Sequence, residues 1–124
     1  MILSDSKHIE EQATIFRALA DTTRLKLVRL LCRQREPDAL CVNALAALLG
    51  VTQSAVSQHL RVLKAMGLVK GERRGYHIHY FVNRDMLAKY RDLILSVLSM
   101  GEPIEEESCR EYCPERREKD VSPF

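Results

Sequence analysis

The sequence lacks a long hydrophobic run. None of its 124 residues belongs to a stretch approaching about 18 consecutive apolar residues, the length of a membrane-spanning helix, so we expect no membrane segment. Residues 1–11 are polar and acidic, without the basic-then-apolar order of a signal peptide. Internal repeats and low-complexity blocks are also missing. These absences predict a protein of the cytoplasm.

The chain is too short for two independent cores, because 124 residues with 46% apolar and 29% charged composition are typical of one globular domain. Disulfides are rare in the cytoplasm, so the cysteines are expected to be metal-binding, redox-active or buried thiols rather than a disulfide framework. There are four of them: Cys32, Cys41, Cys109 and Cys113.

Acidic residues are missing from residues 52–71. The wider segment 51–75 has five basic residues against Glu72 alone, a net charge of +4, whereas residues 102–124 have a net charge of −4. A local positive cluster in a chain whose total net charge is only +2 is typical of a surface that binds a polyanion. A solvated basic face is the alternative interpretation.

Apolar residues recur at helical spacing in five segments. The predicted helices cover residues 8–20, 22–34, 39–49, 53–66 and 84–99. In the first helix the apolar stripe consists of Ile9, Ala13, Phe16 and Ala20. Predicted caps are Asp21, Thr52 and Asn83 at helix starts, and Gly50 and Gly67 at helix ends. A helix, a short turn containing glycine and a second helix form the helix-turn-helix pattern.

The segment after the fourth helix changes to strand-like composition. Residues 68–71 and 76–82 predict a β-hairpin with its turn at residues 72–75, which places Arg73 and Arg74 at the tip. The expected fold is therefore mainly α with a hairpin wing, a winged helix-turn-helix. We expect residues 1–101 to form this domain and residues 102–124 to form an acidic tail.

The fourth helix has two distinct faces. Its core face is predicted to consist of Val56, Leu60 and Leu63. Its polar stripe consists of Ser54, Ser57, Gln58 and Arg61. Such side chains hydrogen-bond base edges and phosphates, and an α-helix fits the major groove of DNA. Any surface helix has a polar face, but the missing acidic residues and the hairpin arginines together favour DNA binding.

Three runs of the sequence resemble the ArsR/SmtB family of bacterial winged-helix repressors. They are residues 18–31 (ALADTTRLKLVRLL), 45–69 (LAALLGVTQSAVSQHLRVLKAMGLV) and 74–80 (RGYHIHY). The resemblance implies a homodimer formed by the first and last helices, bound to a palindromic operator on double-stranded DNA. It also implies repression relieved by an effector, often a metal or metalloid.

The resemblance also implies roles for individual residues. The DNA-binding residues it implies are Gln53, Ser54, Ser57, Gln58 and Arg61 on the recognition helix, and Arg73 and Arg74 on the wing. His59 matches a common histidine of the family, but its offset from the polar stripe favours a structural hydrogen bond over base reading.

Two effector sites of the family do not fit this chain. One uses Cys-Val-Cys at the start of the third helix, where this sequence reads Cys41-Val42-Asn43 and retains only the first thiol. Another uses Asp, His and Glu on the last helix, which here contains no histidine. His77 and His79 lie on one face of a predicted strand, but two further zinc ligands are missing nearby, which favours simple surface histidines.

Cys109 and Cys113 are therefore the preferred effector site. Their i, i+4 spacing places both thiols on one face of a helical turn, and thiolates favour thiophilic ions. Arsenite or antimonite is the first choice, with Cys41 as third ligand and Cys32 as its alternative; a core role for Cys32 stays open. A dithiol redox or persulfide sensor, or a sensor of Cd²⁺, Pb²⁺ or Cu⁺, is the alternative. We expect no permanently bound cofactor and no enzymatic activity.

Overall fold

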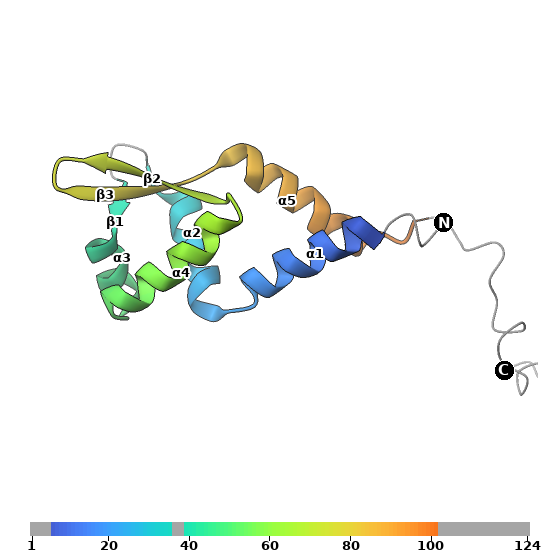
Figure 1. Ribbon diagram of the computed structural model, residues 1–124, viewed down its shortest axis with the longest axis horizontal. Helices are drawn as coiled ribbons and strands as arrows, with labels where there is room; N and C mark the ends of the chain where they lie inside the picture. The colour runs from blue at the N-terminus through green and yellow to red at the C-terminus, as the bar shows by residue number, and fades with distance from the viewer. Residues whose placement is uncertain (1–5, 36–38, 102–124) are drawn as a thin grey trace, which may run out of the picture.

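The computed structural model describes residues 6–35 and 39–101. Their elements are α1 (Ser6–Leu19), α2 (Thr22–Arg33), β1 (Leu40–Cys41), α3 (Val42–Leu49), α4 (Gln53–Ala65), β2 (Val69–Arg74), β3 (His77–Val82) and α5 (Arg84–Val97). The three strands form an antiparallel sheet in the order β1-β3-β2. Figure 1 shows α1 and α5 side by side, extending away from the other elements. The predicted winged helix-turn-helix fold is confirmed.

Each predicted N-cap closes its helix with a side-chain oxygen. Asp21 Oδ1 accepts a hydrogen bond from the backbone N–H of residue 24 at 3.0 Å. Thr52 Oγ1 accepts one from the backbone of Ala55 at 3.0 Å, and Asn83 Oδ1 accepts one from Met86 at 3.2 Å. These bonds satisfy backbone donors that a helix start leaves unpaired.

The third helix begins later than predicted, at residue 42 and not at residue 39. Leu40 and Cys41 instead form β1, which pairs with β3, and α3 begins only at Val42. Gln34 explains the difference, because its Oε1 accepts a hydrogen bond from the Leu40 N–H at 3.0 Å while its Nε2 donates to the Tyr80 carbonyl at 2.6 Å. This side chain holds the segment in an extended conformation beside β3.

The hairpin turn is shorter than predicted. Strand β2 continues through Arg73 and Arg74, and Arg74 pairs with His77, so the turn consists of Gly75 and Tyr76 alone. Gly75 has a φ of 66°, which suits a two-residue turn with glycine in its first central position. The two arginines therefore lie at the end of a strand and not in the turn.

One hydrophobic core joins α2, α3, α4 and the sheet. Its largest fully buried side chains are Leu27, Leu45, Val56, Leu60, Leu63 and Leu68. The predicted core face of α4 is thereby confirmed. Gly71 lets β2 and β3 pair closely, since a Cβ at this position would lie 2.9 Å from Cγ2 of Ile78. We call the elements from α2 to β3 the head.

Helices α1 and α5 form a second unit, which we call the arm. Gln12 Nε2 on α1 donates hydrogen bonds to the Leu93 carbonyl at 2.8 Å and to Ser96 Oγ at 2.7 Å, both on α5. The predicted α1 stripe does not enter the core, because Ile9 is 52% exposed and Phe16 is 41% exposed. No residue of α5 is buried. Within residues 6–35 and 39–101, no helix has the length and apolar character of a membrane span.

Candidate nucleic-acid interface

Helix α4 presents its predicted polar stripe to the outside of the head. Gln53, Ser54, Ser57, Gln58 and Arg61 are all exposed. The opposite side of the helix is fixed in the core, so the backbone that bears these side chains is firmly held. An exposed helix with a rigid back meets the geometric requirement for insertion into a major groove.

The strand register separates the two hairpin arginines. Arg73 pairs with Ile78 and Arg74 with His77, and consecutive residues of a strand point to opposite faces of the sheet. The Arg74 guanidinium carbon lies 4.9 Å from the centre of the Phe81 ring, and its Nε lies 3.9 Å from a Glu72 carboxylate oxygen. Arg74 is half-buried, whereas Arg73 is exposed. The residue types alone do not distinguish Arg73 from Arg74, and the strand register does.

Tyr76 is a surface feature that the sequence analysis did not single out. Its side chain is 95% exposed at the tip of the hairpin, next to Gly75. An aromatic ring in this position contributes nothing to the core and is free to contact a nucleic acid. The available signal was the glycine-aromatic pair between two strand-like segments.

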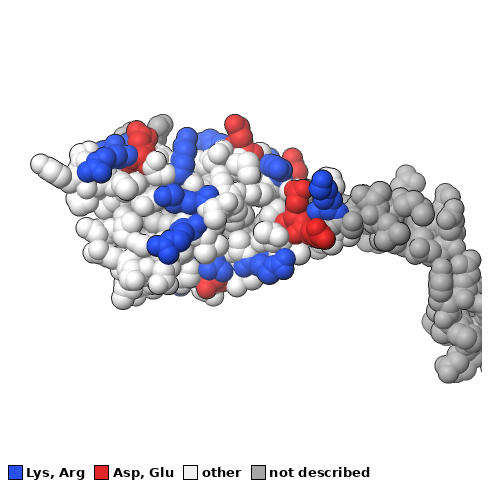
Figure 2. Space-filling view, viewed as in Figure 1, with Lys and Arg blue, Asp and Glu red and all other residues white. Residues whose placement is uncertain are grey.

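Positive charge is concentrated on the head, which also contains the polar stripe of α4 and the hairpin. Figure 2 shows Lys and Arg side chains spread over the head, while the largest group of Asp and Glu side chains lies over the arm. On α4 and β2 the exposed basic residues are Arg61, Lys64, Lys70 and Arg73. The charge distribution favours contact of the head with a polyanion.

His59 lies beside the polar stripe of α4, and its side chain contacts α2. It is half-buried, and its Nδ1 lies 3.3 Å from Nη1 of Arg24 on α2. The prediction that this histidine makes a structural hydrogen bond is confirmed.

Two of the predicted effector cysteines lie in the head, at different places. Cys41 is half-buried at the start of α3 and pairs across the sheet with His79, whose Nδ1 is buried without a hydrogen-bond partner among the described residues. Cys109 and Cys113 lie outside the described residues. In the part of the chain that is described, no group of three or more His, Cys, Asp or Glu side chains is arranged to hold a metal ion.

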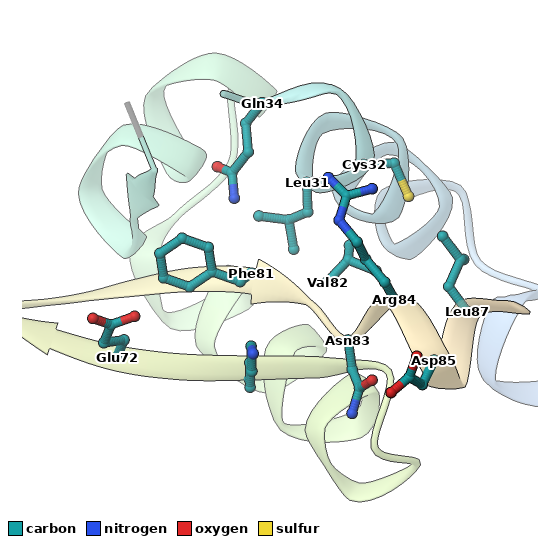
Figure 3. A pocket seen from close by; sticks show the side chains of 11 residues that line it. Leu31, Cys32, Gln34, Glu72, Phe81, Val82, Asn83, Arg84, Asp85 and Leu87 are labelled. Carbon is teal, nitrogen blue, oxygen red and sulfur yellow. The ribbon is translucent and has the colours of Figure 1, made fainter. Parts of the chain in front are cut away.

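Cys32 is exposed, so the core role that the sequence left open for it is wrong. It lines a cavity of about 320 Å³ between the end of α2, the base of the hairpin and the start of α5. Figure 3 shows the Arg84 side chain extending across this cavity from α5 toward α2. Partial burial raises the pKa of the Cys32 thiol, and the charges of Arg84 and Arg33 oppose this effect. The thiol is therefore accessible but not activated.

Comparison with known proteins agrees with this geometry. The fold and the exposed helix define a winged helix-turn-helix DNA-binding domain, a class of transcription regulators and not of enzymes. Residues 21–70 match the bacterial regulatory proteins of the arsR family. The chain is 38% identical over 88 residues to the HTH-type transcriptional regulator NmtR of Mycobacterium tuberculosis, covering 71% of this chain and 70% of that one. The chain belongs to the ArsR family.

Further relatives extend the comparison. The transcriptional repressor SmtB homolog of Synechocystis is 40% identical over 85 residues, which cover 68% of this chain and 61% of that protein. A probable mercury resistance operon repressor of Streptomyces lividans is 38% identical over 88 residues, and the match spans 71% of this chain and 65% of the relative. The crystal structure of a "possible transcriptional regulator for arsenical resistance" superimposes with a TM-score of 0.59 at 37% identity, over 68% of this chain and 83% of that chain.

Proposed function

We propose that this protein is a transcriptional repressor of the cytoplasm that binds operator DNA as a homodimer and leaves it when a thiophilic effector binds. The observation that carries the proposal is the exposed, acid-free polar stripe of α4 beside a hairpin that bears exposed Arg73. An ordinary solvated helix mixes charges of both signs. The polar side chains that this helix exposes are hydrogen-bonding groups and positive charges, without an acidic residue among them.

Each α4 enters one major groove. Gln58 has the amide that pairs with an adenine edge, and Arg61 has the guanidinium that pairs with a guanine edge. Gln53, Ser54 and Ser57, in the first turns of the helix, hydrogen-bond base edges or phosphates there. Arg73 reaches the adjacent backbone from the wing. Arg74 contributes less, because it is already stacked on Phe81 and paired with Glu72.

The arm supplies the dimer interface. Apolar side chains are left exposed on both of its helices, among them Ile9 and Phe16 on α1 and Leu95 and Val97 on α5, and Leu98 and Met100 directly after α5 are exposed as well. Exposed apolar patches of this kind mark protein–protein contacts. A second copy of the same chain is the proposed occupant, and its two-fold symmetry would match a palindromic operator with half-sites about one helical turn of DNA apart.

For the effector we propose As(III) or Sb(III), held by Cys109, Cys113 and Cys41, with Cys32 as the alternative third ligand. Support comes from the donor chemistry, since thiolates prefer thiophilic centres. It also comes from the relatives, one of which is named for mercury resistance and one solved neighbour for arsenical resistance. Cd²⁺ is the second candidate, because a relative in Listeria innocua, 30% identical over 92 residues, is called a cadmium resistance regulatory protein.

Binding of the effector and of DNA must be reciprocal. If the metalloid weakens operator binding by some factor, the operator weakens metalloid binding by the same factor, commonly about 5–150-fold. In the proposed mechanism, ligation tethers the acidic segment 102–124 near the last helix or the dimer interface and favours a spacing or orientation of the two α4 helices that fits DNA less well.

The test starts from an operator selected by the reduced wild-type protein out of a random duplex library under anaerobic conditions. Binding is then titrated with arsenite, antimonite, Cd²⁺ and a persulfide donor, for wild type and for a Cys109→Ser, Cys113→Ser double variant. Release by arsenite that is lost in the double variant supports the proposal. Release that persists in the variant moves the sensor to Cys41 and Cys32. Failure to select any operator would contradict the repressor function itself.

A further inference from the structure

Three side chains, those of Asp21, Arg24 and His59, connect the proposed DNA-recognition helix α4 to the junction between α1 and α2. Arg24 Nε donates a hydrogen bond to the Ala18 carbonyl, and its Nη2 donates to the Arg17 carbonyl at 3.5 Å, both at the end of α1. Its third nitrogen, Nη1, lies 3.3 Å from His59 Nδ1 on α4. Asp21 Oδ1 lies 3.9 Å from His59 Nε2 and also caps α2. One guanidinium therefore contacts α1 and α4 at the same time.

The chemistry of these groups fixes the form of His59. A guanidinium only donates hydrogen bonds, so His59 Nδ1 must accept, and a neutral ring then has its proton on Nε2. This nitrogen lies 3.9 Å from Asp21 Oδ1, too far for a hydrogen bond but close enough for the carboxylate charge to favour an N–H on this side of the ring. The hydrogen bond from the residue 24 backbone lowers the pKa of Asp21, against a smaller opposing effect of desolvation and with help from the charge of Arg24, so the carboxylate stays ionised. The histidine is a bridge between a cation and an anion.

The place of this bridge in the fold is what gives it a function. His59 follows Gln58 directly and is two residues before Arg61, within the exposed reading segment of α4. The other end of the bridge lies where the arm joins the head. The orientation of α4 relative to α1 thus depends on this bridge, together with the apolar core and the hydrogen bond from Tyr90 of α5 to the Met66 carbonyl at the end of α4.

We propose that His59 is a positioning residue for DNA recognition, which holds α4 at a fixed angle to α1 through Arg24 and Asp21. This inference rests on the proposed function. In a homodimer joined through the arm, this angle sets the distance and the tilt between the two reading helices. Operator sites whose half-site spacing matches that angle bind well, and other duplexes bind only through phosphate contacts.

The test compares three substitutions at the same position. His59→Asn places an amide oxygen close to the position of Nδ1 and therefore keeps an acceptor for Arg24. His59→Gln places its amide farther along the side chain, and His59→Ala removes the acceptor. We expect the Ala and Gln variants to lose about tenfold in the ratio of operator to random-duplex affinity, equivalent to one charge-assisted hydrogen bond. The Asn variant retains most of the ratio.

Arg24→Gln tests the other side of the bridge, with Arg29→Gln as its matched control. Both remove one positive charge from α2, but Arg29 is exposed and has no role in the bridge. We expect the first to behave like His59→Ala and the second like wild type. Affinity for random duplex and its salt dependence stay unchanged in the His59 variants, because the phosphate contacts remain.

A spectroscopic measurement tests the bridge without DNA. Long-range ¹H–¹⁵N correlation spectra are expected to show the Nε2–H tautomer for His59 in wild type and in Arg29→Gln, and a mixture of tautomers in Arg24→Gln. An unperturbed tautomer mixture in wild type overturns the bridge. If His59→Ala keeps full operator discrimination, or if its specific and random affinities fall together with its melting temperature, positioning is refuted. A wild type that selects no operator refutes the proposed function instead.

Discussion

The head and the arm solve the problem of burying apolar surface in different ways. The head closes a core of its own, with Leu27, Leu45, Leu60 and Leu63 almost fully inaccessible to solvent. In the part of the arm whose burial is described, Gln12 and Ile15 of α1 are the buried residues, and α5 has none. A unit that contains a buried core and an extension that buries little of its own surface predict different responses to substitution. This difference is the basis of the proposed dimer, in which a second copy of the chain covers the arm.

The largest effect is expected in the head. Leu60→Ala removes a side chain that is 1% exposed, and large-to-small core substitutions cost about 2–5 kcal/mol of unfolding free energy. Urea denaturation followed by circular dichroism measures the loss. Leu25→Ala, at a position that is 52% exposed on α2, is the matched control and should change stability little. Equal losses for both variants would contradict the description of the core.

The next effect concerns the arm. Phe16→Glu combined with Leu98→Glu adds charges to apolar positions that are 41% and 78% exposed, so the folded monomer tolerates them. We expect the dimer to dissociate at concentrations where wild type is dimeric, as measured by sedimentation velocity. The control is Arg91→Glu, also on α5 but at a polar, exposed position. A double variant that stays dimeric would remove the distinction between head and arm.

A smaller effect separates the two wing arginines. Arg73→Gln should reduce the slope of log K against log salt by about one per subunit, because each lost phosphate contact releases one fewer counterion. Arg74→Gln should reduce it by less, since Arg74 is already engaged by Phe81 and Glu72. The slope for each variant is obtained by measuring its affinity for operator and for random duplex from low to high salt. Equal slopes would contradict the separation by the strand register.

The smallest effect is a shift in reactivity. Because burial raises the pKa of Cys32, less of its thiol is ionised at mildly alkaline pH than for an ordinary cysteine. In a variant with the other three cysteines changed to Ser, iodoacetamide should alkylate Cys32 more slowly in the folded protein than in urea. Arg84→Gln should slow the reaction further, because the Arg84 charge lowers this pKa. Faster alkylation in the folded state would reverse the sign of the predicted shift.

Features encoded by neighbouring residues were predictable from the sequence. The caps at Asp21, Thr52 and Asn83 and the core face of α4 follow from side chains within one or two helical turns. Strand β1 was missed because it depends on Gln34 bonding the Tyr80 carbonyl, a residue far along the chain. A hydrogen bond between residues so far apart in the sequence cannot be predicted from the residues around either of them.

The candidate site divides in the same way. Exposure of the α4 stripe followed from helical spacing, but the difference between Arg73 and Arg74 depends on a strand register that the misplaced turn concealed. The partner of His59 also had to be found in the structure, because Arg24 lies on a different helix. The apolar stripe of α1 predicts an amphipathic helix, but periodicity alone does not show whether the apolar face packs against the same chain or against another one.

The hydrogen bonds of Gln12 have a mechanical consequence. By holding the carbonyl of Leu93 and the hydroxyl of Ser96, this one side chain fixes the axial register of α1 against α5. Two helices locked in this way resist shear, so the pair moves as a single lever. A change of orientation between this lever and the head must therefore break or rearrange the contacts that join them, among them the hydrogen bonds of Arg24 to the Ala18 and Arg17 carbonyls and of Tyr90 to the Met66 carbonyl. A signal that passes between the arm and the head would therefore act on these junction contacts and not on the register of α1 against α5.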